Sequence, residues 1–203
     1  MIVVEAGYPT RLGYKKEPVE MSEYNAKILV AAPMLGDPNF RQSVVLMLNG
    51  TDEDAFGVII NRKSDKPISE VWETIFGQPC EINQMIYLGG PVFGPLIAVH
   101  TQKDVADAEI MPGLYFSTQK EALENLIESK RMPFRLYIGG SGWGKGQLAD
   151  EIEKGAWYMM PANAIDVFDD PTEIWKKSLD KAGRIFLQAM IGRITLPEDP
   201  ICN

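Results

Sequence analysis

Short apolar runs, each cut off by glycine, proline or acidic residues, constrain the fold of this chain more than any other feature. Runs of this length are typical of buried strands, which are shorter than helices and end at turn-forming residues. The acidic turn at residues 52–54 separates two of the runs, so we expect these two strands to form a hairpin or to lie side by side. The predicted strands occupy residues 28–32, 44–48, 55–60, 85–88, 96–100, 114–116 and 134–138.

Four segments with helical spacing of their apolar residues lie between or after these strands. The first follows Pro67 and ends before Gly77, the second begins at Thr118, the third covers Gln147–Lys154, and the fourth follows the cap Asp170 and ends at Gly183. Thr118 and Glu121 have the spacing of a capping box, in which each side chain covers a free backbone N–H group. Strands that come first in pairs and then alternate with helices predict an α/β fold of α+β character with a mixed sheet.

The organisation along the chain indicates one domain. The chain has 203 residues, and single domains usually hold about 100–200. Residues 1–25 mix glycine, proline and charges without a period, so we expect a loose leader there. No repeat or linker interrupts residues 28–196, which predicts a single domain over residues 26–203.

The charge balance is acidic, with 20 Lys and Arg against 28 Asp and Glu and a net charge of −8. Both halves of the chain share the acidic excess, which argues against direct binding to nucleic-acid phosphates. The first residues lack the basic start and apolar core of a secretory signal, and no run approaches the roughly 20 apolar residues of a membrane span. We therefore expect a cytoplasmic protein that does not enter the membrane.

One histidine and two cysteines limit the available chemistry. A zinc site of the usual His/Cys kind is excluded, and we expect no metal and no cofactor. His100 ends a predicted strand and is a weak candidate for a catalytic acid–base, since it is the only imidazole. Cys80 and Cys202 lack the Cys-x-x-Cys pattern that activates a thiol, so a redox role for either stays open.

The glycine-rich stretch at residues 139–146 partly matches two catalytic motifs. It fits the G-x-x-x-x-G-K pattern of phosphate-binding loops, but Gly146 stands where a Ser or Thr must hold magnesium. Around Ser141, the nucleophile-elbow pattern fails because Trp143 replaces its last glycine. We therefore expect neither nucleotide hydrolysis nor a serine hydrolase triad. The simpler interpretation is a tight turn, with N–H groups at the next helix start as a candidate anion site.

A polar turn precedes the second predicted strand. Asp37 and Arg41 stand four residues apart, which predicts an ion pair that fixes the turn. In the alternative interpretation, Arg41 faces a cleft and binds a carboxylate or a phosphate.

Four segments, taken together, resemble the YqgE/AlgH family of bacterial proteins. They are Ala31–Val45 (AAPMLGDPNFRQSVV), Gly57–Arg62 (GVIINR), Leu88–Val92 (LGGPV) with His100-Thr101, and Gly142–Leu148 (GWGKGQL) with Glu151-Ile152 and Gly155–Trp157. Their order and spacing match over roughly residues 25–196. The chain departs from the family pattern at Asn49–Thr51, where a His is frequent, at Lys63, where a Pro is frequent, and at Gly140-Ser141, where Tyr-Ala is frequent.

The resemblance implies a compact α/β protein with a strongly twisted, partly barrel-like sheet and helices packed outside. It implies no established reaction, although some family members carry the label of transcriptional regulators. A regulatory role would act more easily through a protein or small-molecule partner, because this chain lacks a helix-turn-helix signal and a basic stripe.

These observations favour a non-catalytic binding or regulatory module whose partner is a protein or a small anionic ligand. The alternative is an enzyme acting on a small anionic substrate, with His100 as acid–base and Arg41 holding the anion. That alternative requires His100, Arg41, Asn61 and the turn at 142–146 to line one pocket. The candidate ligand-binding residues are Asp37, Arg41, Asn61, Gly89, Gly90, His100, Gly142, Trp143, Gly144 and Gln147.

Overall fold

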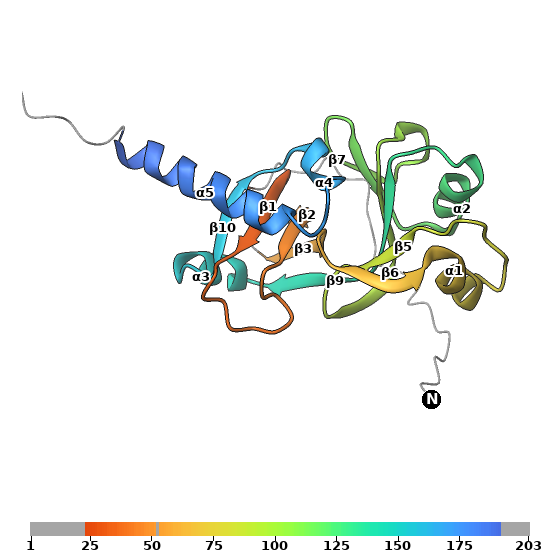
Figure 1. The fold of residues 1–203 in the computed structure, drawn as a ribbon, viewed down its shortest axis with the longest axis horizontal. Helices are drawn as coiled ribbons and strands as arrows, with labels where there is room; N and C mark the ends of the chain where they lie inside the picture. The colour runs from red at the N-terminus through yellow and green to blue at the C-terminus, as the bar shows by residue number, and fades with distance from the viewer. Residues whose placement is uncertain (1–22, 52, 192–203) are drawn as a thin grey trace, which may run out of the picture.

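The structure of the chain, a computed structural model, describes residues 23–51 and 53–191. Ten strands in these residues form a strongly curled half-barrel sheet (Figure 1). The strands are β1 (Lys27–Ala31), β2 (Val44–Gly50), β3 (Asp54–Ile59), β4 (Lys63–Pro67), β5 (Met85–Leu88), β6 (Val92–His100), β7 (Ala108–Met111), β8 (Leu114–Ser117), β9 (Phe134–Gly144) and β10 (Trp157–Pro161). The α/β fold with a mixed, partly barrel-like sheet is confirmed.

The long strand β9 joins the two parts of the sheet. The strand order is β10-β1-β2-β3-β9-β6-β8-β7, with β4 and β5 attached beside β9. The first half of β9 pairs with β6, and its second half pairs with β3. Only the β5–β9 pair is parallel among the strand pairs of the described residues. The predicted hairpin is present, because β2 and β3 are antiparallel neighbours.

Five α-helices of the described residues pack outside this sheet. They are α1 (Ile68–Phe76), α2 (Lys120–Ser129), α3 (Gln147–Glu153), α4 (Ala164–Val167) and α5 (Ile174–Ile191), and a short 3-10 helix covers Lys103–Val105. Figure 1 shows α1 and α2 at one end of the molecule and α3 and α5 at the other. No helix within the described ranges is long and apolar enough to cross a membrane.

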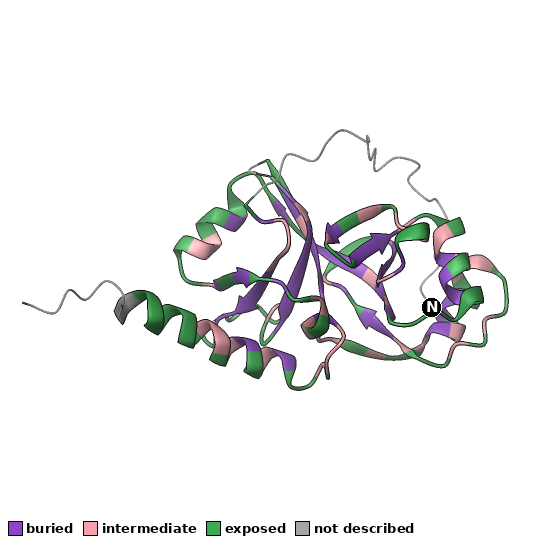
Figure 2. Ribbon diagram, turned by 90° about the horizontal axis from the view of Figure 1, so that it is seen from above, coloured by how far each residue is buried: buried purple, intermediate pink, exposed green. Residues whose placement is uncertain are grey.

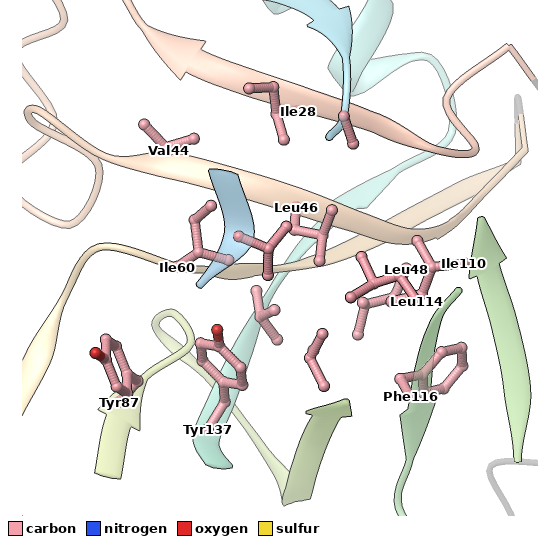
Figure 3. Close-up of a cluster of buried hydrophobic side chains, with 14 of the residues drawn as sticks. Ile28, Val44, Leu46, Leu48, Ile60, Tyr87, Ile110, Leu114, Phe116 and Tyr137 are labelled. Carbon is pink, nitrogen blue, oxygen red and sulfur yellow. The ribbon is translucent and has the colours of Figure 1, made fainter. Parts of the chain in front are cut away.

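Three apolar clusters fill the spaces between helices and sheet, and most of the buried residues lie on strands (Figure 2). The largest lies inside the curled sheet and under α4 and α5, and includes Leu46, Val58 and Tyr137 (Figure 3). A second lies under α1 and α2. The third lies under α3 and contains Trp143 and Trp157.

Three strands were not expected from the sequence. The strand β4 is polar along its whole length, β7 has only four residues, and β10 exposes Tyr158 and Met159. The strands β4 and β7 therefore lack the apolar run that identified the other strands, whereas β10 has such a run at residues 157–160 that was not assigned to a strand. The turn expected over residues 139–146 is also wrong for most of its length, because β9 continues as a strand to Gly144.

The expected helix ends were wrong at two places. The helix α2 begins at Lys120, and Thr118 does not cap it. The carboxylate of Asp107 accepts hydrogen bonds from the N–H groups of Thr118 (2.6 Å) and Gln119 (3.0 Å), so a distant residue covers this helix start. The helix α5 passes through Gly183 and ends at Ile191, because its apolar spacing continues beyond the glycine.

The expected leader at residues 1–25 lies outside the described residues up to residue 22. Residues 23–26 form a turn, and Tyr24 is buried against the third cluster. Cys202 also lies outside the described part of the chain, whereas Cys80 is a half-buried free thiol.

Candidate functional site

Two of the four sequence motifs meet at a cluster of three aromatic rings. The ring of Phe40 stacks on Trp143, with centroids 6.0 Å apart, and meets the ring of Trp157 edge-on at 5.4 Å. The indole N–H groups of both tryptophans donate to Oε2 of Glu151, at 2.9 and 2.8 Å. The amide of Gln147 donates to the other carboxylate oxygen, Oε1, at 2.9 Å. The site residues Trp143 and Gln147 are thus joined through one half-buried carboxylate.

The motif at Asn61 and Arg62 holds the loop that carries Phe40. The side chain of Asn61 accepts from the N–H of Val44 and donates to the carbonyl of Gln42, both at 2.8 Å. The guanidinium of Arg62 donates to the carbonyl of Asn39 at 2.5 Å. Asn61 therefore ties the loop to β2, and it uses both ends of its amide to do so.

The ion pair expected between Asp37 and Arg41 does not occur among the ion pairs of the described residues. The carboxylate of Asp37 instead accepts from the N–H of Asn39 at 2.7 Å, and its carbonyl accepts from the N–H of Arg41 at 2.8 Å. These local bonds fix the turn without the guanidinium. Both side chains are exposed.

The glycine pair Gly89-Gly90 lies against the middle of β9. The N–H of Gly89 donates to the carbonyl of Ile138 at 2.9 Å, and its own carbonyl accepts from the hydroxyl of Ser141 at 3.0 Å. A Cβ atom on Gly89 would lie 2.3 Å from the carbonyl oxygen of Gly139. The glycines therefore permit two backbones to cross closely, and the hydroxyl of Ser141 is used in that crossing.

The glycines of the fourth motif do not present a free row of N–H groups. Gly142 and Gly144 are exposed residues of β9, and the N–H of Gly144 donates to Oε1 of Gln147 at 3.1 Å. Gly146, with a φ of 70°, is the N-cap residue that precedes α3. The N–H at Gly144, which was a candidate for holding an anion, is therefore already bonded to a side chain.

His100 is fully buried between β6, β8 and the loop that follows β6. Its Nδ1 atom accepts from the N–H of Gln102 at 3.2 Å, so the proton of the neutral ring is on Nε2. The Nε2 atom lies 3.0 Å from the hydroxyl of Ser117, which donates in turn to the carbonyl of Val105. Burial lowers the pKa of His100 to about 4, so the ring is neutral at pH 7.

Two hollows of the described surface bear on the enzyme alternative. The smaller has a volume of about 100 Å³ and is lined by Tyr24, Thr51, Ala55, Gly144, Gly146, Leu148 and Ala149. The larger, of about 250 Å³, lies elsewhere and is lined by Lys63, Gln84, Met85, Tyr87, Met132, Pro133, Phe134, Arg135 and Phe168. Neither is lined by His100, Arg41 or Asn61, so neither has the geometry that the enzyme alternative requires.

The larger hollow, here called the Arg135 pocket, was not expected from the sequence. The guanidinium of Arg135 donates to the carbonyls of Ile60 (3.4 Å), Val167 (2.6 Å) and Asp169 (2.6 Å). It also lies over two aromatic rings, 4.7 Å from the centroid of Tyr87 and 5.9 Å from that of Phe168. The sequence feature that could have indicated this pocket is Arg135 itself, the single charged residue inside the apolar run 134–138.

Two tyrosines of the largest cluster, Tyr87 and Tyr137, lie beside each other near this arginine, and the hydroxyl of Tyr137 points toward Ile60 (Figure 3). The rings of Tyr87 and Tyr137 are 5.6 Å apart. Burial raises the pKa of both phenols, so both are protonated at neutral pH. The hydroxyl of Tyr137 is buried and has no hydrogen-bond partner among the described residues.

No three His, Cys, Asp or Glu side chains of the described residues lie close enough together to hold a metal ion. The carboxylates nearest to Arg135 are already bound. Asp169 pairs with Lys177 at 2.7 Å, and Asp170 accepts from the N–H of Thr172 at 2.9 Å. The pKa of each of these two carboxyls is lowered by those contacts.

The half-barrel sheet with helices outside, and the motif residues that meet under α3, define a class of α/β protein with known relatives. The AlgH-like family model matches residues 28–186. A UPF0301 protein of Chlorobaculum tepidum is 38% identical over 165 residues, which cover 77% of this chain and 86% of the relative. A UPF0301 protein of Thermobifida fusca is 35% identical over 193 residues, covering 87% of this chain and 93% of the relative. The chain therefore belongs to the AlgH-like family, which confirms the resemblance seen in its motifs.

Solved structures agree with this assignment. The solution structure of the AlgH protein from Pseudomonas aeruginosa matches with a TM-score of 0.70 at 25% identity, covering 90% of this chain and 100% of that one. The crystal structure of a protein from Corynebacterium diphtheriae matches with a TM-score of 0.63 at 25% identity, covering 82% of this chain and 88% of that one.

Proposed function

We propose that this chain is a non-catalytic binding module whose ligand is a small organic anion held in the Arg135 pocket. One observation supports the proposal above all others. The charged side chains that line the pocket, Lys63 and Arg135, are both cations, and neither forms an ion pair within the described ranges. In a chain of net charge −8, two cations at one hollow without a direct carboxylate partner favour a ligand that supplies the negative charge.

The contacts of Arg135 hold its guanidinium ready for such a ligand. Of the five N–H groups of an arginine, three are engaged by the carbonyls of Ile60, Val167 and Asp169. No backbone carbonyl of the described residues accepts from the Nε–H or from the second N–H of Nη2, and these neighbouring nitrogens match the two oxygens of a carboxylate. Because the guanidinium is already fixed, little conformational entropy is lost when the anion binds.

The rest of the lining favours an anion with a small apolar body. Met85, Met132 and Phe168 supply thioether and aromatic surface beside the two cations. The volume of about 250 Å³ is slightly below the range of typical ligand pockets. A monocarboxylate with a short branched or aromatic body fits both the size and the lining.

The lining also supports binding rather than catalysis. The pocket is lined by no His, Cys, Asp or Glu, which are the usual groups for proton transfer or nucleophilic attack near neutral pH. Its tyrosine, Tyr87, has a raised pKa. His100, on which the enzyme alternative depends, does not line this pocket, is fully buried, and is neutral at pH 7 because burial lowers its pKa to about 4.

A regulatory role in a bacterial cytoplasm belongs to the same proposal. The bacterial sources of the relatives and the free thiol of Cys80 support that setting. The net charge of −8 argues against direct contact with nucleic acid, so regulation would proceed through the bound anion or through a protein partner. A gel shift at low and moderate salt tests this point, and retention of DNA at moderate salt would contradict it.

The binding proposal is tested by NMR titration of the full chain with benzoate, isovalerate and inorganic phosphate. We expect the two carboxylates to perturb the signals of residues around the pocket and to bind more tightly than phosphate. Arg135→Gln should weaken carboxylate binding about tenfold or more, because a charge-assisted bidentate contact is lost. Arg131→Gln is the matched control, since Arg131 is exposed and pairs with Asp104 outside the pocket.

A second variant is needed because Arg135 also donates to three backbone carbonyls, so Arg135→Gln could weaken binding by destabilising the fold. Lys63 is exposed and its removal leaves the described hydrogen bonds intact. We expect Lys63→Gln to weaken carboxylate binding severalfold with an unchanged unfolding midpoint. Absence of binding for all three probes, or equal binding by wild type and Lys63→Gln, would overturn the proposal.

A further inference from the structure

The helix α5 continues well beyond the surface that it covers. Its first half packs on the largest cluster through Ile174, Trp175, Leu179 and Ala182. The indole N–H of Trp175 donates to the carbonyl of Ala31 at 2.9 Å, which fixes this half on β1. Beyond Gly183 the helix projects past β10 (Figure 1), and its residues 183–189 are exposed (Figure 2).

The projecting part, here called the α5 overhang (residues 183–191), carries the same apolar stripe as the covered part. Phe186 and Ala189 follow Trp175, Leu179 and Ala182 at steps of three or four residues, so all five lie on one helix face. Ile185 borders this stripe. The exposed fractions are 65% for Phe186 and 44% for Ile185, so an apolar face leaves the protein body with nothing from the described residues over it.

A helical segment this short is not stable in water by itself. Isolated helices need about 12–15 residues even with favourable sequences, and most helical stability in proteins comes from packing of an apolar face. Within the described residues, the overhang is anchored only by the covered half of α5. A partner that covers Ile185 and Phe186 would supply the missing packing.

We propose that this partner is a second copy of the chain, whose overhang packs antiparallel against the first. In a two-fold pair the same patch serves both copies, so the patch must be complementary to itself. Ala189 follows Phe186 along the exposed part of the stripe, and a small residue beside a large one leaves room for the Phe186 ring of a second, antiparallel helix. The overhang projects from the body (Figure 1), so a second copy can reach its apolar face.

The charge distribution favours this partner. Within residues 183–191 the sequence contains one charged side chain, Arg184, and no acid. Arg184 stands two residues before Phe186 and therefore lies on the opposite side of the helix. Two overhangs therefore meet without the carboxylate repulsion that the acidic excess of the chain would cause at an acidic surface.

An acidic membrane surface is a poorer partner for the same helix. Such helices need free cations beside their apolar face. Lys177 and Lys181 of α5 are paired with Asp169 and Asp166, at 2.7 and 3.4 Å. The cations that would contact lipid headgroups are thus partly neutralised within the chain itself.

The test is sedimentation velocity of the full chain from about 5 to 500 µM, since a contact of a few side chains per copy gives a weak, reversible dimer. We expect the wild type to shift from monomer to dimer over this range, and Phe186→Glu to remain monomeric throughout. Phe93→Glu is the matched control, because Phe93 is fully exposed on β6 and the substitution is chemically the same. It should dimerise like the wild type.

Cross-linking examines the antiparallel arrangement directly. Position 186 of one copy should face position 186 of the other, whereas position 188 lies off the stripe. Oxidation with copper phenanthroline should therefore link Phe186→Cys into covalent dimers well above the wild-type background, and Gln188→Cys should not exceed that background. A chain that stays monomeric at every concentration overturns the proposal. Covering of the overhang by residues 192–203 would give this result, and so would a helix that binds lipid, which vesicles of phosphatidylglycerol would reveal by binding the monomer.

Discussion

The Nε2 atom of His100 lies 3.0 Å from the hydroxyl oxygen of Ser117, and both side chains are fully buried. The serine hydroxyl donates to a carbonyl, so it can only accept from Nε2. This pair stabilises the neutral ring, and protonation would place a charge in the interior without a buried carboxylate to match it. The only imidazole of the chain is thus part of the packing between β6 and β8.

The stability of the protein should therefore fall in mildly acidic solution. The pKa of His100 is about 4 in the folded protein against 6.5 in the unfolded chain, so the unfolded chain takes up the proton first as the pH falls. The histidine contribution is fully present above pH 6.5 and is lost progressively down to pH 4. By pH 5 the loss amounts to about 2 kcal/mol.

Urea unfolding at pH 7.5, 6 and 5 measures this loss. The variant His100→Gln provides the reference because it lacks the titrating imidazole. The carboxylates titrate in both proteins, so their effect on the unfolding free energy cancels in the difference. We expect the difference in unfolding free energy between wild type and His100→Gln to shrink as the pH falls. An identical difference at all three pH values would contradict the assignment.

A second prediction concerns the carboxylate between the two tryptophans. Glu151→Ala removes the acceptor of both indole N–H groups, those of Trp143 and Trp157, and both rings are buried. Two unsatisfied buried donors cost about 2–4 kcal/mol together. Glu153→Ala on the same helix is the control, because Glu153 is exposed, and it should change the unfolding free energy by less than about 0.5 kcal/mol.

Chemical unfolding monitored by tryptophan fluorescence measures the unfolding free energies of Glu151→Ala and Glu153→Ala. The folded spectrum of Glu151→Ala should also shift, since water or a reoriented ring must take over the indole contacts. If the two variants unfold at the same denaturant concentration, the carboxylate is not an important acceptor for these rings.

The strands that could be predicted from the sequence are those with an apolar run of their own. The strands β1, β2 and β3 were found in this way because their buried residues are contiguous. The polar strand β4 was not predicted because it forms by pairing with β5. The residues of β4 alone show no pattern that indicates this pairing. The start of α2 was misplaced for the same reason, since Asp107, 11 residues before Thr118, supplies the cap.

The candidate site illustrates the same limit of local patterns. The glycines at residues 139–146 favoured a turn, yet β9 continues through them to Gly144. Glycine is needed in this strand because the backbone at Gly89 and Gly90 passes close to it. The sequence did not predict Arg135 as a site residue, because an arginine in a strand normally faces water. Its pocket is created by segments that are distant in sequence, including Tyr87 and Phe168.

The crossing of Gly89 over β9 gives the third prediction. A Cβ atom at residue 89 would lie 2.3 Å from the carbonyl oxygen of Gly139, and this oxygen belongs to backbone that cannot rotate away. Gly89→Ala should therefore separate β5 from β9 and lower the unfolding free energy by about 3 kcal/mol or more. Gly94→Ala on β6 is the control, because a Cβ atom there meets nothing within 4 Å. Thermal and urea unfolding of the two variants measure the effect, and a Gly89→Ala protein as stable as Gly94→Ala would show that the two backbones do not cross so closely.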